Sequence, residues 1–91
     1  MKIRWTKGAS ENLENIEEFI GKDDPRAAIE MILKVIHSVG QLAGYPAMGR
    51  PGRIEGTKEL VVSGTPFIVP YRVKNETVQI LKVLHHSQKW P

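Results

Sequence analysis

The stretch that decides the fold is residues 49–91, which reads GRPGRIEGTKELVVSGTPFIVPYRVKNETVQILKVLHHSQKWP. A basic loop rich in glycine and proline leads into three short apolar segments, 57–62, 67–73 and 77–85, which are typical of β-strands. Short turns separate these segments, and two consecutive tight turns predict an antiparallel meander. Pro70 conflicts with this pattern because it removes a ladder donor from the middle strand, so we expect a bulge or a locally unpaired neighbour there.

The first half of the chain predicts one short strand and two helices. Residues 2–5 alternate polar and apolar, as in a half-buried strand. Thr6 is expected to cap the first helix, and Gly21 to end it in a left-handed conformation. Asp24 and Pro25 are typical of the start of a second helix.

Both helices carry one apolar stripe with steps of three and four residues, at positions 9, 13, 16 and 20 and at positions 28, 32, 35, 39 and 42. A short connection between them predicts an antiparallel helical hairpin. Residues 45–56 have no apolar periodicity and predict a loop. The chain therefore predicts the element order β-α-α-β-β-β.

Four linked motifs resemble the RelE/ParE family, the small toxins of bacterial toxin–antitoxin pairs, and are closest to the ParE branch and the plasmid-stabilisation toxins. They are GRPG at 49–52, GTKELVV at 56–62, PFIVPYRV at 66–73 and LHHSQKWP at 84–91. The resemblance extends weakly to the first half and so covers nearly the whole chain. It implies an α+β fold in which a helical hairpin packs on a small, largely antiparallel twisted sheet.

Length and composition restrict the class of protein. Ninety-one residues predict one domain, 1–91, and the absence of cysteine excludes disulfides and thiolate metal sites. No apolar run approaches the roughly 18 residues that span a bilayer, and the N-terminus lacks the apolar core of a signal peptide. We therefore expect a soluble, cytoplasmic protein without a membrane partner.

Basic residues concentrate in the second half of the chain. Residues 1–44 carry six Lys and Arg against seven Asp and Glu, a balance of −1, whereas residues 45–91 carry seven against three, a balance of +4. This excess indicates either an ordinary solvated surface or a basic face for RNA, DNA or an acidic protein.

Some members of the resembled family are ribonucleases that cut messenger RNA in the ribosome, which requires a general base, an acid and cations around the phosphate. Two departures weaken this activity here: Glu59 stands where those relatives tend to place an arginine, and Ser87 where they often place a tyrosine. If the chain were nevertheless a ribonuclease, the catalytic set would be His86, Arg53, Lys58 and Arg72.

The histidines do not predict a metal site. His85 and His86 are expected to point to opposite faces of a strand, so they would not share one ion. His37 lies among apolar helix positions and is expected to be packed or partly exposed. We predict neither a metal nor another cofactor.

Two readings stand for the residues that could contact a partner. Arg50 and Arg53 either pair with Glu55 and Glu59 or form a fixed arginine pair for a phosphate or carboxylate. Trp90 either packs the C-terminal tail onto the domain or is an exposed anchor. The candidates for contact with a target or an antitoxin are Arg50, Arg53, Arg72, His85, Lys89 and Trp90, while Tyr71 is expected in the core with its hydroxyl bonded at the rim.

The resemblance implies a toxin that is neutralised by a cognate antitoxin in a hetero-oligomer. The ParE branch inhibits DNA gyrase through a protein interface, without chemistry of its own. The alternative is a RelE-type mRNA interferase that acts on the ribosome and messenger RNA. A third reading is a degenerate relative that still binds its antitoxin but no longer harms the cell.

Overall fold

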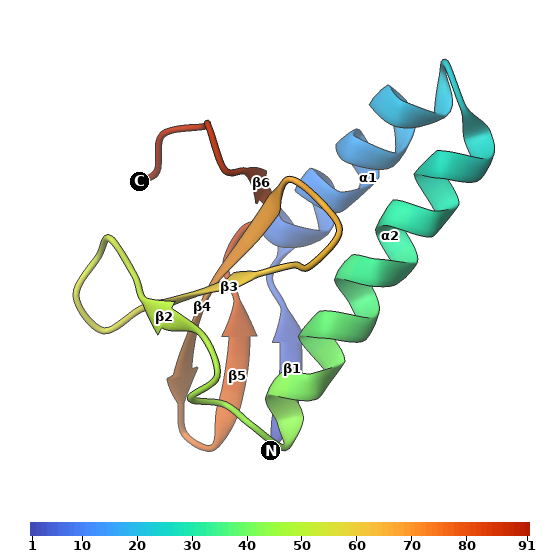
Figure 1. The fold of residues 1–91 in the computed structure, drawn as a ribbon. Coiled ribbons are helices and arrows are strands. Elements are labelled where there is room, and N and C mark those ends of the chain that lie inside the picture. The colour runs from blue at the N-terminus through green and yellow to red at the C-terminus, as the bar shows by residue number, and fades with distance from the viewer.

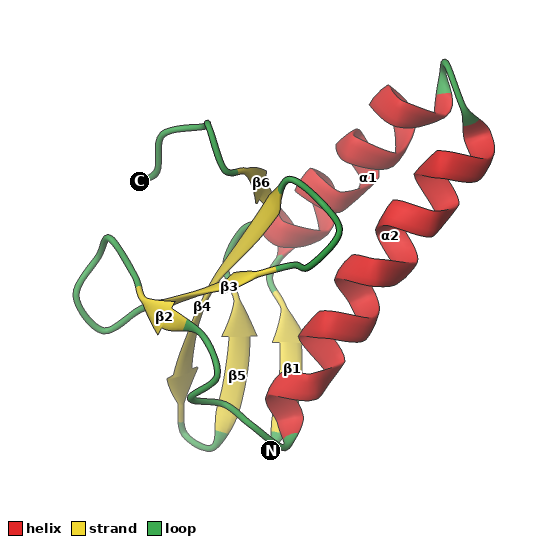
Figure 2. Ribbon diagram, in the orientation of Figure 1, coloured by secondary structure: helices red, strands yellow, loops and turns green.

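The computed structural model describes residues 1–91 and contains a helical hairpin that covers one face of a mixed sheet (Figures 1 and 2). The α+β class and the predicted order of the helices and longer strands are confirmed. In chain order the elements are β1 (Lys2–Trp5), α1 (Lys7–Gly21), α2 (Pro25–Gly40), the 3₁₀ helix η1 (Gln41–Ala43), β2 (Arg50–Pro51), β3 (Lys58–Val61), β4 (Phe67–Lys74), β5 (Thr77–Ile80) and β6 (Leu84–His85).

The strands lie in the order β1-β5-β4-β3-β2, and β6 also pairs with β4. All of these pairs are antiparallel except β1 with β5, in which Lys2 lies opposite Thr77. The first strand of the chain is thus held by a strand near its other end, as Figure 2 shows. No helix combines the length and apolar character needed to cross a membrane.

Side-chain caps fix the starts of both helices as predicted. The hydroxyl oxygen of Thr6 accepts a hydrogen bond from the Ala9 N–H at 3.2 Å and donates to the Ile80 carbonyl at 2.7 Å. Asp24 accepts from the Ala27 N–H at 3.1 Å, with proline at the first helical position. The Thr6 cap therefore also ties α1 to the sheet.

The predicted left-handed end of the first helix is wrong. Gly21 is its last helical residue, and Lys22 follows in right-handed conformation with its N–H bonded to the Glu18 carbonyl at 3.2 Å. A β-carbon on Gly21 would lie 3.7 Å from that of Ala28 in α2. This glycine therefore stands where the two helices approach each other, and the tight connection to Asp24 replaces the expected cap.

The main core lies between the helical hairpin and the sheet. It joins the apolar stripes of the helices, which include Val35 and Val39 of α2, to the residues of the sheet that face the helices. Among the latter are Leu60, Val62, Val69, Tyr71 and Ile80. A second, smaller cluster of Ile68, Leu84 and Trp90 lies on the opposite face of the sheet. Strand parity thus divides the apolar residues between two faces of unequal size.

Two strand predictions need correction. The final strand is broken: β5 ends at Ile80 and β6 begins at Leu84. Pro70 faces this break, and its carbonyl accepts from the Leu81 N–H at 2.9 Å and the Lys82 N–H at 3.4 Å. The expected local interruption at Pro70 is thereby confirmed, and it is also why the last strand is split. The second correction concerns the predicted loop, which contains the short strand β2.

Candidate functional site

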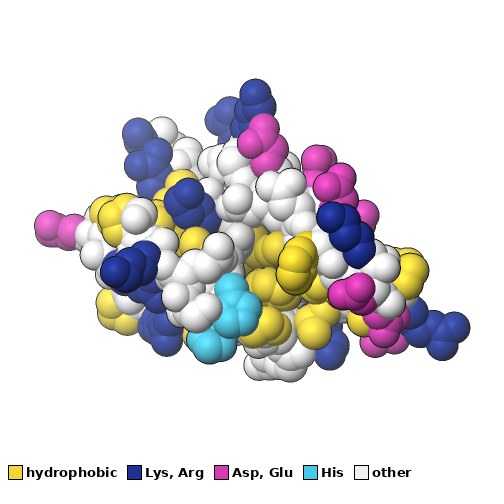
Figure 3. All heavy atoms as spheres, turned by 90° about the horizontal axis from the view of Figure 1, so that it is seen from above, with side chains coloured by type: hydrophobic (Ala, Val, Ile, Leu, Met, Phe, Trp, Pro, Cys, Tyr) yellow, Lys and Arg dark blue, Asp and Glu magenta, His cyan; other side chains and the backbone are white.

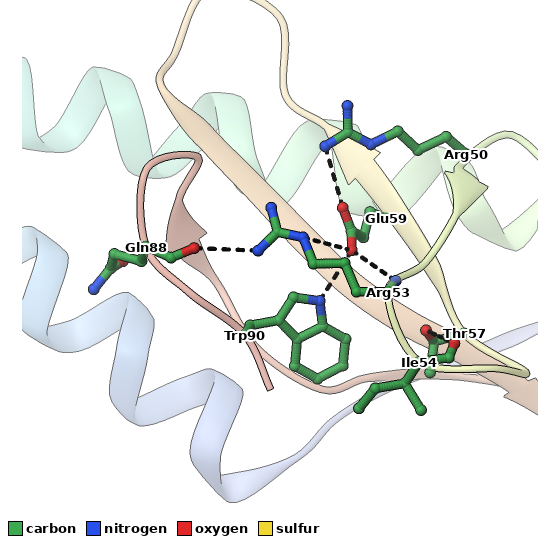
Figure 4. Close-up of polar contacts among 7 residues, drawn as sticks. All are labelled: Arg50, Arg53, Ile54, Thr57, Glu59, Gln88 and Trp90. Atoms are coloured by element: carbon green, nitrogen blue, oxygen red, sulfur yellow. Dashed lines mark hydrogen bonds and ion pairs between the residues drawn. The ribbon is translucent and has the colours of Figure 1, made fainter.

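Glu59 in β3 is the only charged residue that the fold buries, with 2% of its surface exposed. Its Oε1 accepts from Arg50 Nη2 at 3.1 Å. Its Oε2 accepts from the Trp90 indole N–H at 2.9 Å and the Arg53 backbone N–H at 3.1 Å, and lies 3.5 Å from Arg53 Nε (Figure 4). Both carboxylate oxygens are paired, which is what a buried charge requires.

The loop reaches this carboxylate because β2 pairs with β3 and places Arg50 opposite Glu59. Beyond β2 the loop closes on itself: the Gly52 N–H donates to the Thr57 carbonyl at 2.9 Å, and the Thr57 hydroxyl donates to the Ile54 carbonyl at 2.5 Å. This closure brings the Arg53 backbone to Glu59. The Arg50 and Arg53 side chains remain 54% and 37% exposed, so both guanidinium groups also meet solvent.

The glycines of the GRPG motif permit close packing. A β-carbon on Gly49 would lie 2.7 Å from Cε1 and from the hydroxyl oxygen of Tyr71, and one on Gly52 would overlap Thr57. The Tyr71 hydroxyl donates to the Pro46 carbonyl at 2.7 Å and accepts from the Gly49 N–H at 2.9 Å. Tyr71 is buried with its hydroxyl bonded at the rim, as predicted.

The C-terminal tail packs back onto the domain. Trp90 is 7% exposed and lies against Ile68 and Leu84, and Arg53 Nη1 donates to the Gln88 carbonyl at 3.2 Å. The tail-packing reading of Trp90 is therefore confirmed and the exposed-anchor reading is wrong. The physical reason is that the indole N–H finds a buried carboxylate acceptor while the ring covers apolar surface.

Two opposing effects set the pKa of Glu59. Burial raises it, but hydrogen bonds from the Trp90 indole, the Arg53 backbone and the Arg50 guanidinium, with the charge of Arg53, outweigh burial and hold the pKa below its ordinary value of 4.5. Burial raises the pKa of Tyr71 above 10.0, opposed in part by its bond from the Gly49 N–H. Glu59 is thus held as an anion at neutral pH.

The expected opposite orientation of the two adjacent histidines is wrong. The rings of His85 and His86 stack with their centroids 4.5 Å apart. The alternation is lost because β6 ends at His85 and a turn follows, in which the Ser87 N–H donates to His85 Nδ1 at 3.1 Å and the His85 N–H donates to Gln88 Oε1 at 2.7 Å. No group of three or more potential metal ligands is present.

The structure brings only part of the predicted catalytic set together. Arg53 contacts the tail at Gln88, and His86 is held there by a bond from its N–H to the Pro66 carbonyl at 2.9 Å. Arg72 lies six residues along from Pro66, which corresponds to about 20 Å of extended strand, and its Nε donates to Gln79 at 2.6 Å.

The remaining candidates lie in three places. Lys58 is opposite Pro51 and Tyr71 in the sheet. Lys89 is exposed in the tail next to Trp90, and His37 is exposed in the last turn of α2. Arg50, Arg53 and Trp90 thus meet at Glu59, whereas Arg72 does not contact it.

Sequence reasoning named Glu59 as a partner of the arginines but missed its burial and its bond to Trp90. Glu55, the other predicted partner, makes no ion pair. The available signal was a carboxylate at an outward-facing strand position, close in sequence to two arginines. The contact with Trp90 joins positions 31 apart and left no such signal.

Comparisons with known proteins give consistent matches over nearly the full length. Residues 3–90 match the family described as the ParE toxin of the type II toxin–antitoxin system parDE. The protein named "Putative toxin Y4kP" of Sinorhizobium fredii is 48% identical over 99% of this chain and 93% of its own. "Toxin RelE2" of Caulobacter vibrioides is 33% identical over 96% of this chain and 97% of its own.

Two solved structures are similar. One is described as the chromosomal ParDE system of P. aeruginosa: TM-score 0.86, 27% identity, 93% of this chain and 95% of the other covered. The second is the toxin–antitoxin complex RelBE2 of Mycobacterium tuberculosis, with TM-score 0.59, 29% identity and coverage of 93% and 96%.

Proposed function

The chain belongs to the ParE toxin family of type II toxin–antitoxin systems, and we propose that it arrests growth by binding DNA gyrase through a protein interface. The family predicted from the sequence is thereby confirmed. Action on gyrase would place the protein in the cytoplasm, where it would work without a cofactor and without making or breaking a covalent bond.

The observation that carries the proposal is the environment of Glu59. A nuclease site surrounds the reacting phosphate with cations, since negative charge develops there in the transition state. Here a buried anion sits between the two arginines of the loop, and a phosphate placed between them would face it. The separation of Arg72 from His86 removes a further cation from the predicted catalytic set.

The second candidate function is a ribosome-dependent mRNA interferase. The similarity to RelBE2 and to "Toxin RelE2" favours it, as does the presence of Arg53 and His86 near the same tail. In that reading His86 would move the proton and Arg53 would contact the phosphate. This reading places the phosphate close to the buried carboxylate of Glu59, whose Oε2 lies 3.5 Å from Arg53 Nε.

A cognate antitoxin is the partner that the solved complexes support. We propose that one of its segments covers a groove of about 530 Å³ between α1 and the C-terminal turn. Figure 3 shows hydrophobic side chains gathered beside the histidines. The groove is lined by Ile16, Phe19 and Ile20 of α1 and by Pro66, Phe67 and His85, and Phe19 is largely exposed. Such a surface suits the apolar face of an amphipathic helix.

Gyrase inhibition is tested by incubating the purified chain with gyrase, ATP and plasmid DNA. We expect loss of supercoiling and linear DNA that carries covalently attached protein, with the acid-unfolded chain as the inactive control. A chain that arrests growth but leaves gyrase untouched, and that cuts messenger RNA in a translating extract, would establish the second candidate instead. A chain that does neither and does not arrest growth would be the degenerate relative.

A further inference from the structure

We propose that Glu59 joins the arginine loop, residues 50–53, and the C-terminal tail, residues 88–90, into one interaction surface that fits an acidic patch on a protein. The proposal rests on the proposed function, because it identifies the surface that the target would contact. Glu59 is its positioning residue: it is buried and touches no partner, but it holds the groups that do.

The joining role follows from the contacts of one carboxylate. Arg50 and Arg53 reach Glu59 from the loop, and Trp90 reaches it from the tail, 31 positions further along the chain. The only other polar link between loop and tail is the bond from Arg53 Nη1 to the Gln88 carbonyl. The loop and the tail converge on this side chain in Figure 4, so removing it would leave the bond from Arg53 to Gln88 as the one polar link between them.

The arginines retain donors for a partner. Each guanidinium has five N–H donors, whereas Arg50 uses one donor atom on Glu59 and Arg53 uses its Nε on Glu59 and one Nη on Gln88. Both side chains are substantially exposed, so the unused donors can be reached by a partner. A guanidinium already fixed in direction loses little entropy when it binds a carboxylate in bidentate fashion.

The charge and the aromatic content of this surface favour protein over nucleic acid. Nucleic-acid binding relies on uncompensated cations along the phosphates and on exposed aromatic rings for base stacking. Here Glu59 compensates one of the two arginine charges, and Trp90 is buried beneath the loop rather than free to stack. A carboxylate on a protein partner needs only the N–H donors of Arg50 and Arg53 that Glu59 and Gln88 leave unused.

The test compares Glu59→Gln, Arg50→Ala and Arg4→Ala in a Trp5→Phe background, so that Trp90 is the only tryptophan. Gln keeps the shape of Glu59 but loses its charge. Arg4 is an exposed arginine on β1, at the other edge of the sheet from β2, and serves as the matched control. The readouts are Trp90 emission and quenching by acrylamide, potency against gyrase, and growth arrest in cells.

We expect Glu59→Gln to shift Trp90 emission to the red, raise its quenching and lower potency about tenfold or more. Arg50→Ala should lower potency without moving the Trp90 signal, because Arg50 contacts the partner while Glu59 positions the tail. Arg4→Ala should change neither. Wild-type potency in Glu59→Gln, or equal losses in Arg50→Ala and Arg4→Ala, would overturn the proposal. If circular dichroism shows that Glu59→Gln does not fold, the potencies of Arg50→Ala and Arg4→Ala still test whether the loop belongs to the interaction surface.

Growth arrest separates failure of this proposal from failure of the gyrase proposal. If the wild type leaves gyrase untouched but arrest still depends on Glu59 and Arg50 and not on Arg4, the surface stands and the target is another protein. Wild-type binding to a homopolymer RNA that weakens steeply with salt, and that strengthens in Glu59→Gln, would instead overturn the acidic-protein partner.

Discussion

The two faces of the sheet are stabilised in different ways. The face under the helices is apolar, and its residues follow local periodicities of two in strands and three or four in helices. The opposite face depends on one charged side chain that joins the nearby arginine loop to the C-terminal tail, 31 positions further along the chain. Apolar packing tolerates an approximate fit, whereas a buried charge is stable only when all of its partners are present. We therefore expect the apolar face to account for most of the free energy of unfolding. The face that contains Glu59 should instead fix the positions of the arginine loop and the C-terminal tail.

The largest effect should come from the helix-facing side. Ile80→Ala removes a fully buried side chain and should lower the free energy of unfolding by about 3 kcal/mol, the sum of lost burial and a cavity. Val73→Ala, on the same sheet but exposed, should change it by less than about 0.5 kcal/mol. Urea denaturation followed by circular dichroism measures both. Similar losses in the two variants would contradict the contrast.

Substitution of Gly49 tests how tightly the loop packs against Tyr71 in the core. Gly49→Ala places a β-carbon against the Tyr71 ring and should cost about 2 kcal/mol through overpacking. Gly40→Ala is the matched control, because nothing lies near its β-carbon position and the residue is helical. It should stabilise by up to about 1 kcal/mol, since alanine favours a helix over glycine. Thermal melts of both variants should move in opposite directions; a rise in both would show that the loop yields without strain.

The turn between β4 and β5 offers a test of stability that depends on neither face of the sheet. Asn75 and Glu76 have φ of 52° and 59°, a left-handed conformation that favours glycine. Glu76→Gly should therefore raise the free energy of unfolding by about 1 kcal/mol. The same change at Glu30, inside α2, should lower it by about the same amount. Chemical denaturation of the pair measures the two signs, and a loss in Glu76→Gly would refute the strain.

The smallest effect is a pH dependence confined to the polar face. The pKa of Glu59 is lower in the folded chain than in the unfolded chain, so the unfolded state binds more protons in acid. The contribution of Glu59 is therefore complete above the unfolded pKa, near 4.5, and is lost as the pH falls through the folded pKa. The stability difference between the wild type and Glu59→Gln should shrink from pH 6 towards pH 3. A constant difference would show that the charge is immaterial.

Sequence reasoning was most successful where structure is local. The caps at Thr6 and Asp24 and the apolar stripes were predicted because neighbouring residues determine them. The core position of Tyr71 was predicted from strand parity, although its hydroxyl bonds Pro46, 25 positions away. The break between β5 and β6 was missed, although Pro70 signalled a disturbance, because the disturbed strand is the partner and not the one that carries the proline.

Prediction of the site failed at two points. The stacking of His85 on His86 depends on where β6 ends, and the burial of Glu59 depends on Trp90 reaching it. The turn after His85 is local but was not predicted, whereas the contact of Glu59 with Trp90 is not encoded near Glu59. The positions of Arg50 and Arg53 in the loop could be predicted from the sequence, but the geometry that orients their guanidinium groups could not.

The parallel pairing of β1 with β5 has a consequence for the timing of synthesis. Lys2 and Thr77 are 75 positions apart, so at 5–20 residues per second roughly 4–15 s separate the making of one strand from that of its partner. Until then β1 has no neighbour, and the Thr6 cap lacks its acceptor on Ile80. A ribosome carrying this message therefore holds a nascent chain that is not yet a folded toxin for most of translation, and the interval in which an antitoxin must be ready begins only as the final strands emerge.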